Sequence, residues 1–494
     1  MSNRPETNKQ SCPVYKKCGG CQLQNLSYPE QLEFKQKKVE KLLKRFCTVE
    51  KIIGMKTPYH YRNKVQAAFY TDKKGKIISG VYQSGSHHVV GIDSCQTEDV
   101  IADKIIVAVR KLLPSFRMTT YNEDTGKGFL RHILVKRGFA TNQIMLVLVT
   151  GTPVFPSKNN FVKAILKQFP EITTIVQNIN PYRTNLVLGD NQKVLYGKGY
   201  IEDILCGCRF RISPKSFYQI NPVQTEVLYG KAIEFANLKG NETVLDTYCG
   251  IGTIGIIAAK NGAGNVIGAE LNGDAVRDAI VNARANNLKN IRFYKADAGE
   301  FMREATDEDE KPDVVFMDPP RAGSDRKFLD SLIKMSPKKV VYVSCNPETL
   351  ARDLAYLTQN SPYKAQKIQP VDMFPHTAHI ETVVLLSHKK PDGHINVKVE
   401  FGEGEGKVPL DDIAQRAESY KPKERVTYKM IKEYIEAKYG FKVHTAYIAE
   451  VKRDLGLPMY DAPNAVEELK QPRKHPTAEK VEAIKDALKH FEVI

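Results

Sequence analysis

The sequence has no apolar run of the roughly 18 residues that a membrane-spanning helix needs. Its first ten residues, MSNRPETNKQ, contain no hydrophobic stretch, so no secretory signal is expected. We therefore predict a cytoplasmic protein with no membrane partner, in a reducing compartment where disulfides are rare. Nine cysteines are few for 494 residues, and in this setting they are more typical of metal ligands, a nucleophile or buried small side chains than of a disulfide framework.

Acidic residues are scarce at the front of the chain. Residues 1–80 hold 17 Lys and Arg against 6 Asp and Glu, whereas residues 391–494 hold 18 against 19. The whole chain carries a net charge of +16. A concentrated basic surface suits a polyanion, because each neutralised phosphate releases condensed counterions. The charge distribution therefore favours nucleic acid as the partner, although a basic surface that is merely solvated has the same composition.

The length predicts about three structural units, because it exceeds what one hydrophobic core usually organises, and we find no internal repeat. Residues 1–49 form a segment with clustered cysteines. Residues 50–205 consist mostly of short β-rich runs, such as HILVKRG and IMLVLVT, with helical periodicity near 100–113 and 159–168. We interpret 50–205 as a central α+β domain that completes the cysteine site.

Strands and helices alternate regularly in residues 206–390. This alternation predicts an α/β, Rossmann-like domain, a parallel sheet with helices on both faces. The stretches HKKPDGHINVK and GEGEGKVPLDD are typical of a linker. Beyond it, helical patterns at 426–455 and 477–491 predict that residues 391–494 form a small helical C-terminal extension.

A glycine-rich loop, DTYCGIGTIG, follows an apolar strand and leads into a helix. The spacing of Gly250, Gly252 and Gly255 lets the backbone approach a ligand closely. Glu270 ends the next strand, 24 residues after Asp246, where a carboxylate can accept hydrogen bonds from ribose hydroxyls. The loop predicts a nucleoside site and by itself suits a nicotinamide cofactor equally well.

Three further motifs lie at the carboxyl edge of the predicted sheet, where open α/β sheets bind ligands: DPPR at Asp318, SCNP at Cys345 and FPHTAHIE ending at Glu381. Cys345 precedes a helix with proline in its first turn, and the positive end of that helix favours a thiolate. Taken singly, a cysteine at a strand end is more often structural, and a glutamate more often lies on the surface. Together with the glycine loop they indicate a nucleophile and a base.

Four thiols at the front of the chain form a possible metal site: Cys12, Cys18 and Cys21 are clustered, and Cys95 is remote. Glycines 19 and 20 permit a tight turn between two of them. Four thiolates suit either zinc or an iron–sulfur cluster, and the spacing does not decide between them.

These motifs resemble those of the RNA uracil-C5 methyltransferases, whose branches modify 23S ribosomal RNA and transfer RNA. The resemblance covers residues 12–388 and rests on SFYQINP, DTYCGIGTIG, MDPPRAG, VSCNPETLARDL and FPHTAHIETVVLL. It implies a methyltransferase domain that uses S-adenosyl-L-methionine, and the following site residues: Gln219, Tyr248, Glu270 and Asp318 on the cofactor, Cys345 as the nucleophile and Glu381 as the base. Similarity to the ribosomal branch further implies a [4Fe-4S] cluster on Cys12, Cys18, Cys21 and Cys95.

The chemistry explains why this family needs a thiol and a carboxylate. C5 of uracil is a weak nucleophile until a thiolate adds at C6, and the C5 proton must later be removed by a base. We therefore expect a monomeric enzyme that makes 5-methyluridine in 23S ribosomal RNA, with the target base flipped out or unpaired. The alternatives are a transfer RNA methyltransferase, a nicotinamide oxidoreductase and a non-catalytic iron–sulfur RNA-binding protein. The tRNA branch usually lacks the cysteine cluster, and the oxidoreductase has no need of Cys345 with Glu381.

Overall fold

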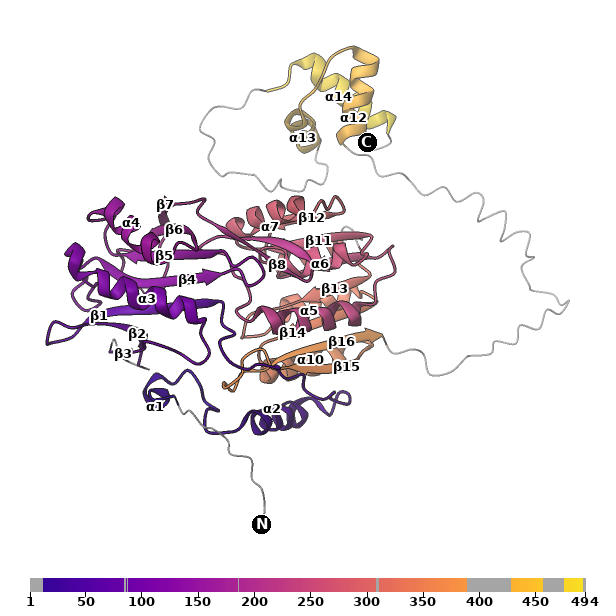
Figure 1. The fold of residues 1–494 in the computed structure, drawn as a ribbon. Helices are drawn as coiled ribbons and strands as arrows, with labels where there is room; N and C mark the ends of the chain where they lie inside the picture. The colour runs from indigo at the N-terminus through magenta and orange to yellow at the C-terminus, as the bar shows by residue number, and fades with distance from the viewer. Residues whose placement is uncertain are drawn as a thin grey trace. The chain divides into compact units, whose positions relative to one another are not determined.

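The chain folds into two compact units, residues 1–394 and residues 395–494 (Figure 1). The computed structural model describes residues 12–83, 86, 88–184, 186–307, 311–388, 428–455 and 475–491. The first unit holds every motif that resembles the methyltransferase family. Among the described residues, no helix combines the length and the apolar character that crossing a bilayer requires.

The N-terminal segment consists of a short helix and a long one. They are α1 (Tyr15–Cys18) and α2 (Tyr28–Leu43). α2 begins with a capping box, in which the backbone N–H of Ser27 donates to Glu30 Oε2 at 2.7 Å. Its apolar stripe, with Val39 and Leu43 fully buried, packs into the core of the methyltransferase domain. The segment is therefore part of the same unit as the sheet it covers.

The central domain is a seven-stranded sheet in the order β3-β2-β1-β4-β5-β6-β7. Its elements are β1 (Lys64–Thr71), β2 (Ile77–Tyr82), β3 (Val89–Gly91), α3 (Val100–Leu112), η1 (Pro114–Phe116), β4 (Leu130–Arg137), β5 (Ile144–Thr150), α4 (Lys158–Gln168), β6 (Ile172–Ile179) and β7 (Asn191–Tyr196). Every residue of β5 is buried, because alternate side chains such as Leu146 and Leu148 face α3 and α4, while Met145 and Val147 face the methyltransferase domain. The predicted α+β character and both predicted helices are confirmed.

The methyltransferase domain is built on a second seven-stranded sheet, in the order β12-β11-β10-β13-β14-β16-β15. Its elements are α5 (Pro222–Ala236), β10 (Thr243–Asp246), α6 (Thr253–Lys260), β11 (Asn265–Glu270), α7 (Gly273–Ala285), β12 (Ile291–Lys295), α8 (Ala298–Asp307), β13 (Val314–Met317), α9 (Arg326–Met335), β14 (Lys339–Ser344), α10 (Pro347–Asn360), β15 (Tyr363–Val371) and β16 (Glu381–His388). Helices α5, α6 and α7 cover one face and α8, α9 and α10 the other, as the alternating pattern predicts.

The prediction of a wholly parallel sheet is wrong at one side. β10 to β14 pair in parallel, but β16 runs antiparallel to both β14 and β15. Strands β15 and β16 are joined by the nine-residue loop 372–380 and form a hairpin, which needs no crossover helix. As a result β16 begins at the edge where the parallel strands end.

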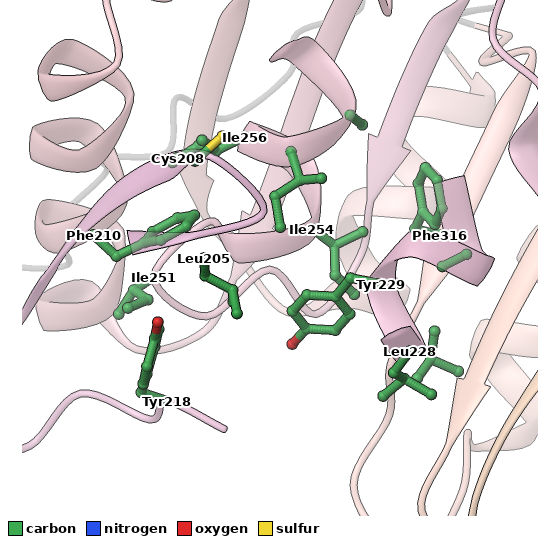
Figure 2. Packing of buried hydrophobic residues seen from close by; sticks show 14 of the residues in the cluster. Leu205, Cys208, Phe210, Tyr218, Leu228, Tyr229, Ile251, Ile254, Ile256 and Phe316 are labelled. Carbon is green, nitrogen blue, oxygen red and sulfur yellow. The ribbon is translucent and has the colours of Figure 1, made fainter. Parts of the chain in front are cut away.

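A two-stranded hairpin links the two sheets. It consists of β8 (Ile201–Leu205) and β9 (Cys208–Ile212). Figure 2 shows Leu205, Cys208 and Phe210 of this hairpin packed near Ile254 and Ile256 of α6, in one buried cluster. Cys208 is thus a core residue. Cys206 lies in the turn between β8 and β9, with a φ of 49°.

The second unit has a hydrophobic core of its own. Its helices are α12 (Tyr428–Tyr439), α13 (Thr445–Asp454) and α14 (Ala478–His490). Ile435, Ile448 and Leu488, one from each helix, are fully buried together. The predicted helical extension is confirmed for these residues, with the first helical pattern divided in two at Gly440, where φ is 74°. The two predicted linker stretches, 388–398 and 402–412, lie outside the described residues apart from His388, the last residue of β16.

Candidate active site

The candidate site lies at the carboxyl edge of the parallel strands. Asp246 and Glu270 end β10 and β11, and Asp318 and Cys345 follow β13 and β14 directly. Glu381 is the first residue of β16, and because β16 is antiparallel it meets the same edge. The ladder that pairs Ser344 with Thr382 places the nucleophile candidate and the base candidate next to each other, one on each neighbouring strand. Glu381 thus reaches the side of the site where Cys345 lies only because β16 is antiparallel, a direction that the sequence pattern does not predict.

These side chains share one cavity of about 460 Å³. All six residues predicted for the cofactor and for catalysis line it, namely Gln219, Tyr248, Glu270, Asp318, Cys345 and Glu381. Further lining residues, which the sequence analysis does not select as site residues, include Phe217, Tyr229, Asp246, Arg321, Phe374 and His379. Most of these residues lie in or beside one of the sequence motifs, so their position in the sequence could have indicated a place in the site. Tyr229 lies inside α5, and no sequence motif points to it.

The glycine loop is held by two carboxylates. Asp246 Oδ2 accepts a hydrogen bond from the Gly255 N–H at 2.8 Å, and Glu270 Oε2 accepts one from the Gly250 N–H at 3.0 Å. The second oxygen of Asp246 is buried with no protein partner. A Cβ at Gly250 would point into open space, so the loop leaves room for a ligand above it.

Two carboxyl groups of the site have strongly raised pKa values. Burial raises the pKa of Asp246 to about 7, with the charges of Asp318 and Glu270 adding to the effect. Burial likewise raises the pKa of Asp318 to about 7. Each carboxyl is therefore poised between its neutral and charged forms near neutral pH, the usual signature of a functional site. Asp246 is therefore a further candidate site residue, which its place at the start of the motif DTYCGIGTIG does not by itself reveal.

The thiol of Cys345 contradicts the prediction that a helix terminus makes it a thiolate. α10 does begin two residues later, at Pro347, but burial and the charges of Glu381 and Asp318 raise the pKa of the thiol to about 11, and Arg321 offsets only part of this. Glu381 is 3% exposed, and burial together with Asp318 raises its pKa well above the ordinary value. The thiol of Cys345 is therefore protonated at neutral pH, and burial favours the neutral form of Glu381 as well.

Gln219 and Tyr248 also line the cavity. Gln219, 9% exposed, precedes α5, and its side chain hydrogen-bonds to the hydroxyl of Tyr229. The ring of Tyr248 lies 5.4 Å from the ring of Phe328, and its hydroxyl is 3.4 Å from Ser324 Oγ. A half-buried aromatic ring beside a polar wall suits a flat heterocycle such as adenine.

The four cysteines predicted to hold a metal lie near one another but are not arranged as a metal site. Burial and the charges of Cys95, Cys18 and Cys12 raise the pKa of the Cys21 thiol to about 12. The amide of Cys95 is tied to its own loop, donating to Asp103 Oδ2 at 2.8 Å. Within the described ranges, no three Cys, His, Asp or Glu side chains are placed to hold a metal ion. The predicted [4Fe-4S] cluster is therefore not supported.

The chain is similar in sequence to known RNA methyltransferases. The family model described as tRNA (Uracil-5-)-methyltransferase matches residues 183–389. An "Uncharacterized RNA methyltransferase" of Bacillus cereus is 44% identical over 388 residues, which are 78% of this chain and 84% of the relative. Another, from Listeria monocytogenes, is 46% identical over 76% of this chain and 83% of the relative.

A solved structure agrees in fold. The tRNA (uracil-54, C5)-methyltransferase of Pyrococcus abyssi, in complex with S-adenosyl-L-homocysteine, is 31% identical, covers 74% of this chain and 85% of its own, and superposes with a TM-score of 0.63. The chain belongs to the RNA uracil-C5 methyltransferase family. It is accordingly an S-adenosylmethionine-dependent RNA methyltransferase with a mixed α/β methyltransferase fold.

The cavity of this uracil-C5 methyltransferase fits the methyl donor. The unpartnered oxygen of Asp246, the open space above Gly250 and the aromatic wall at Tyr248 offer an acceptor, a close backbone approach and a stacking surface. These are the features that an adenosine-containing molecule requires. Cys345 and Glu381, the candidate nucleophile and base, line the same cavity.

Proposed function

We propose that the protein methylates C5 of specific uridines in 23S ribosomal RNA, giving 5-methyluridine. The observation that carries the reaction is the shared cavity in which Cys345 and Glu381 occupy neighbouring strands beside the glycine loop. A thiol and a carboxyl on adjacent strand ends can contact C6 and C5 of one pyrimidine, whereas hydride transfer has no use for this pair.

Cys345 is the nucleophile in this proposal. Its Sγ adds to C6 of the flipped uracil, so that an S–C6 bond forms and the electron pair of the C5–C6 double bond becomes an enolate. S-adenosylmethionine, when bound, supplies the methyl group that C5 takes. The carboxylate of Glu381 then removes the C5 proton, and the electron pair of the C5–H bond expels the thiolate. The thiol proton of Cys345 passes to solvent before addition. In the elimination the C5–H electron pair re-forms the C5–C6 double bond, the S–C6 pair leaves with sulfur, and Glu381 ends with the C5 proton.

The burial of Cys345 and Glu381 determines the protonation state in which each of them can react. Burial makes Glu381 a stronger base once it is ionised, because its pKa is raised well above the ordinary value. The same burial keeps Cys345 protonated until substrate enters, since its pKa is about 11. We propose that addition at C6 becomes faster with rising pH, and that the apparent pKa belongs to the coupled group and not to one residue.

Four residues hold the cofactor in this proposal. Glu270 accepts hydrogen bonds from the ribose, Tyr248 lies against the adenine, and Gln219 and Asp318 face the end that carries the methyl group. Support comes from their positions around one cavity, with Glu270 already fixed by the Gly250 N–H at 3.0 Å.

The second candidate substrate is transfer RNA. The matching family description and the Pyrococcus abyssi structure, at 31% identity, both name tRNA. The preference for 23S ribosomal RNA is supported by the spacing of the four N-terminal cysteines, which resembles the ribosomal branch. We expect the basic front of the chain to contact phosphates of either RNA.

The deciding experiment is to incubate the protein with a labelled methyl donor and, separately, with unmodified 23S and tRNA transcripts. We expect label in 5-methyluridine of the 23S transcript, mapped by mass spectrometry of nuclease fragments. Label in tRNA alone would assign the protein to the second candidate. Loss of label in Cys345→Ala, with donor binding retained, would tie the product to the proposed thiol.

No step of this proposal passes through an iron–sulfur cluster. The iron and sulfide content of anaerobically purified protein shows whether four cysteines are free thiols or ligands of a cluster: Cys12, Cys18, Cys21 and Cys95. We expect no stoichiometric iron, because the structure arranges no metal site there. About four irons and four sulfides per chain would show that the resemblance predicts this segment better than the structure does.

A further inference from the structure

The loop 372–380 joins β15 to β16 and shapes one wall of the cavity. Val371 pairs with Glu381, so the loop closes immediately before the proposed base. Phe374 and His379 of the loop line the cavity together with Glu381. The conformation of this loop therefore decides what faces the reacting base.

Asp372, the first residue of the loop, is held from the N-terminal segment. Lys35 Nζ of α2 donates to Asp372 Oδ1 at 2.6 Å, and both side chains are completely buried. The same ammonium donates to the carbonyl of Phe374 at 3.0 Å. The hydroxyl of Tyr28 donates to Asp372 Oδ2 at 2.9 Å and accepts from the Met55 N–H at 2.6 Å. Both oxygens of Asp372 are thus occupied by donors from α2.

A second contact with α2 holds the middle of the loop. His376 has a φ of 69°, a backbone conformation that residues other than glycine rarely adopt. Its backbone N–H donates to Gln31 Oε1 at 2.8 Å, and Gln31 Nε2 lies 3.2 Å from His376 Nδ1. The other ring nitrogen is 2.9 Å from the carbonyl of Pro58. A neutral ring protonated at Nε2 satisfies all three contacts, and they retain a backbone that would otherwise relax.

Residues near the N-terminal cysteines and Tyr61 also hold loop 372–380. The Leu23 N–H donates to the carbonyl of His376 at 2.9 Å, and the Ala378 N–H donates to Gln22 Oε1 at 3.2 Å. The hydroxyl of Tyr61 donates to the carbonyl of Pro375 at 2.9 Å. The loop is therefore held by partners from several parts of the chain before residue 62, and none of these partners lines the cavity.

A buried ion pair contributes little net free energy to the packing of a helix on a sheet. Removing two charges from water costs several kcal/mol per ion, and apolar residues of similar size often stabilise as well or better. α2 already packs through Val39 and Leu43. The ion pair of Lys35 and Asp372 is better explained by the geometry it imposes on the loop than by stability.

We propose that Asp372 is a positioning residue for the methyltransferase reaction, anchored by Lys35 and Tyr28 so that loop 372–380 presents Phe374, His379 and Glu381 to the reacting base. This inference rests on the proposed function and assigns the N-terminal segment a part in catalysis. The step most sensitive to the loop is proton removal by Glu381, because misplacement of a reacting group by about 1 Å can cost on the order of a hundredfold in rate.

The test uses the full-length protein and the RNA on which the wild type is active. Tyr28→Phe removes one hydrogen bond to Asp372 while keeping the ring, and Asp372→Asn removes the charge. Tyr363→Phe is the matched control, because the hydroxyl of Tyr363 is also buried and donates to the carbonyl of Pro337 at 2.6 Å, at the opposite edge of the sheet. Donor binding, kcat, KM for RNA, thermal stability and covalent adduct on denaturing gels are measured for each variant.

We expect Tyr28→Phe and Asp372→Asn to bind the donor as the wild type does, to lose about tenfold or more in kcat with KM for RNA nearly unchanged, and to accumulate methylated covalent adduct. Tyr363→Phe should match the wild type in turnover. The proposal is overturned if Tyr28→Phe is destabilised but turns over normally, or if all three variants lose activity in proportion to stability. Failure of the proposed function is seen separately, as a wild type that forms no adduct dependent on Cys345.

Discussion

The reactivity of Cys345 in the ligand-free protein offers a direct test of the site electrostatics. Burial, Glu381 and Asp318 raise the pKa of this thiol from 9.0 to about 11. At about pH 8 roughly one molecule in a thousand then carries a thiolate, against about one in ten for an unperturbed thiol, a difference on the order of a hundredfold. Cys345 should therefore react slowly with alkylating reagents, and its rate should still rise about tenfold per pH unit between about pH 7 and about pH 10.

The assay is pulsed alkylation with iodoacetamide across this pH range, with the modified peptides quantified by mass spectrometry. Glu381→Gln removes the largest electrostatic contribution, so the inflection of the Cys345 profile should move to lower pH. Cys206 is an internal control, because burial, Glu226 and Cys208 raise its pKa to about 12 and Glu381 makes no contribution. A wild-type Cys345 profile that levels off below about pH 9 would refute the reasoning.

Three further predictions address the base, the glycine loop and the second unit. Glu381→Gln should form the covalent adduct with RNA and fail to release it, seen as a shifted, labelled band on denaturing gels; an unshifted band with active donor binding would point to another base. Because the pKa of Asp246 is raised to about 7, its folded state holds a proton more tightly than the unfolded state, and stability is lost as pH rises from about 4 to about 7. Asp246→Asn should reduce this fall, measured as Tm against pH, and an unchanged slope would contradict it. Leu488→Ala should destabilise the α12–α14 core by about 2–5 kcal/mol while leaving the calorimetric transition of residues 1–394 in place. One transition shifted as a whole would show that the two units unfold together.

Local sequence patterns predict much of the scaffold. The alternation around Asp246, Glu270 and Asp318 predicts three successive strand ends, because parallel strands buried on both faces read as short apolar runs between turn residues. The same patterns predict α3, α4 and the helices of the second unit, whose apolar faces repeat with helical periodicity.

The features that sequence patterns miss depend on contacts between distant parts of the chain. The direction of β16 is not encoded in the run TVVLLS, since a buried apolar strand looks the same in either direction. Burial raises the pKa of Cys345 most, and two carboxyl groups 36 and 27 positions away in sequence raise it further, so the start of α10 at Pro347 predicts the wrong sign. The contact of Lys35 with Asp372 spans 337 positions and has no local signature.

The pairing of Ser344 with Thr382 also bears on how the enzyme can move. Accommodating a large folded RNA generally requires loops or whole domains to shift on microsecond to millisecond timescales. Cys345 and Glu381 are each bonded to a residue of that pair, so they belong to one hydrogen-bonded backbone ladder and travel as a rigid body during such motion. When RNA enters, other walls of the cavity can therefore move apart without separating the two strand ends that carry the thiol and the carboxylate. The ladder thus keeps the backbone at positions 345 and 381 together, while loop 372–380 governs how the Glu381 side chain faces the base.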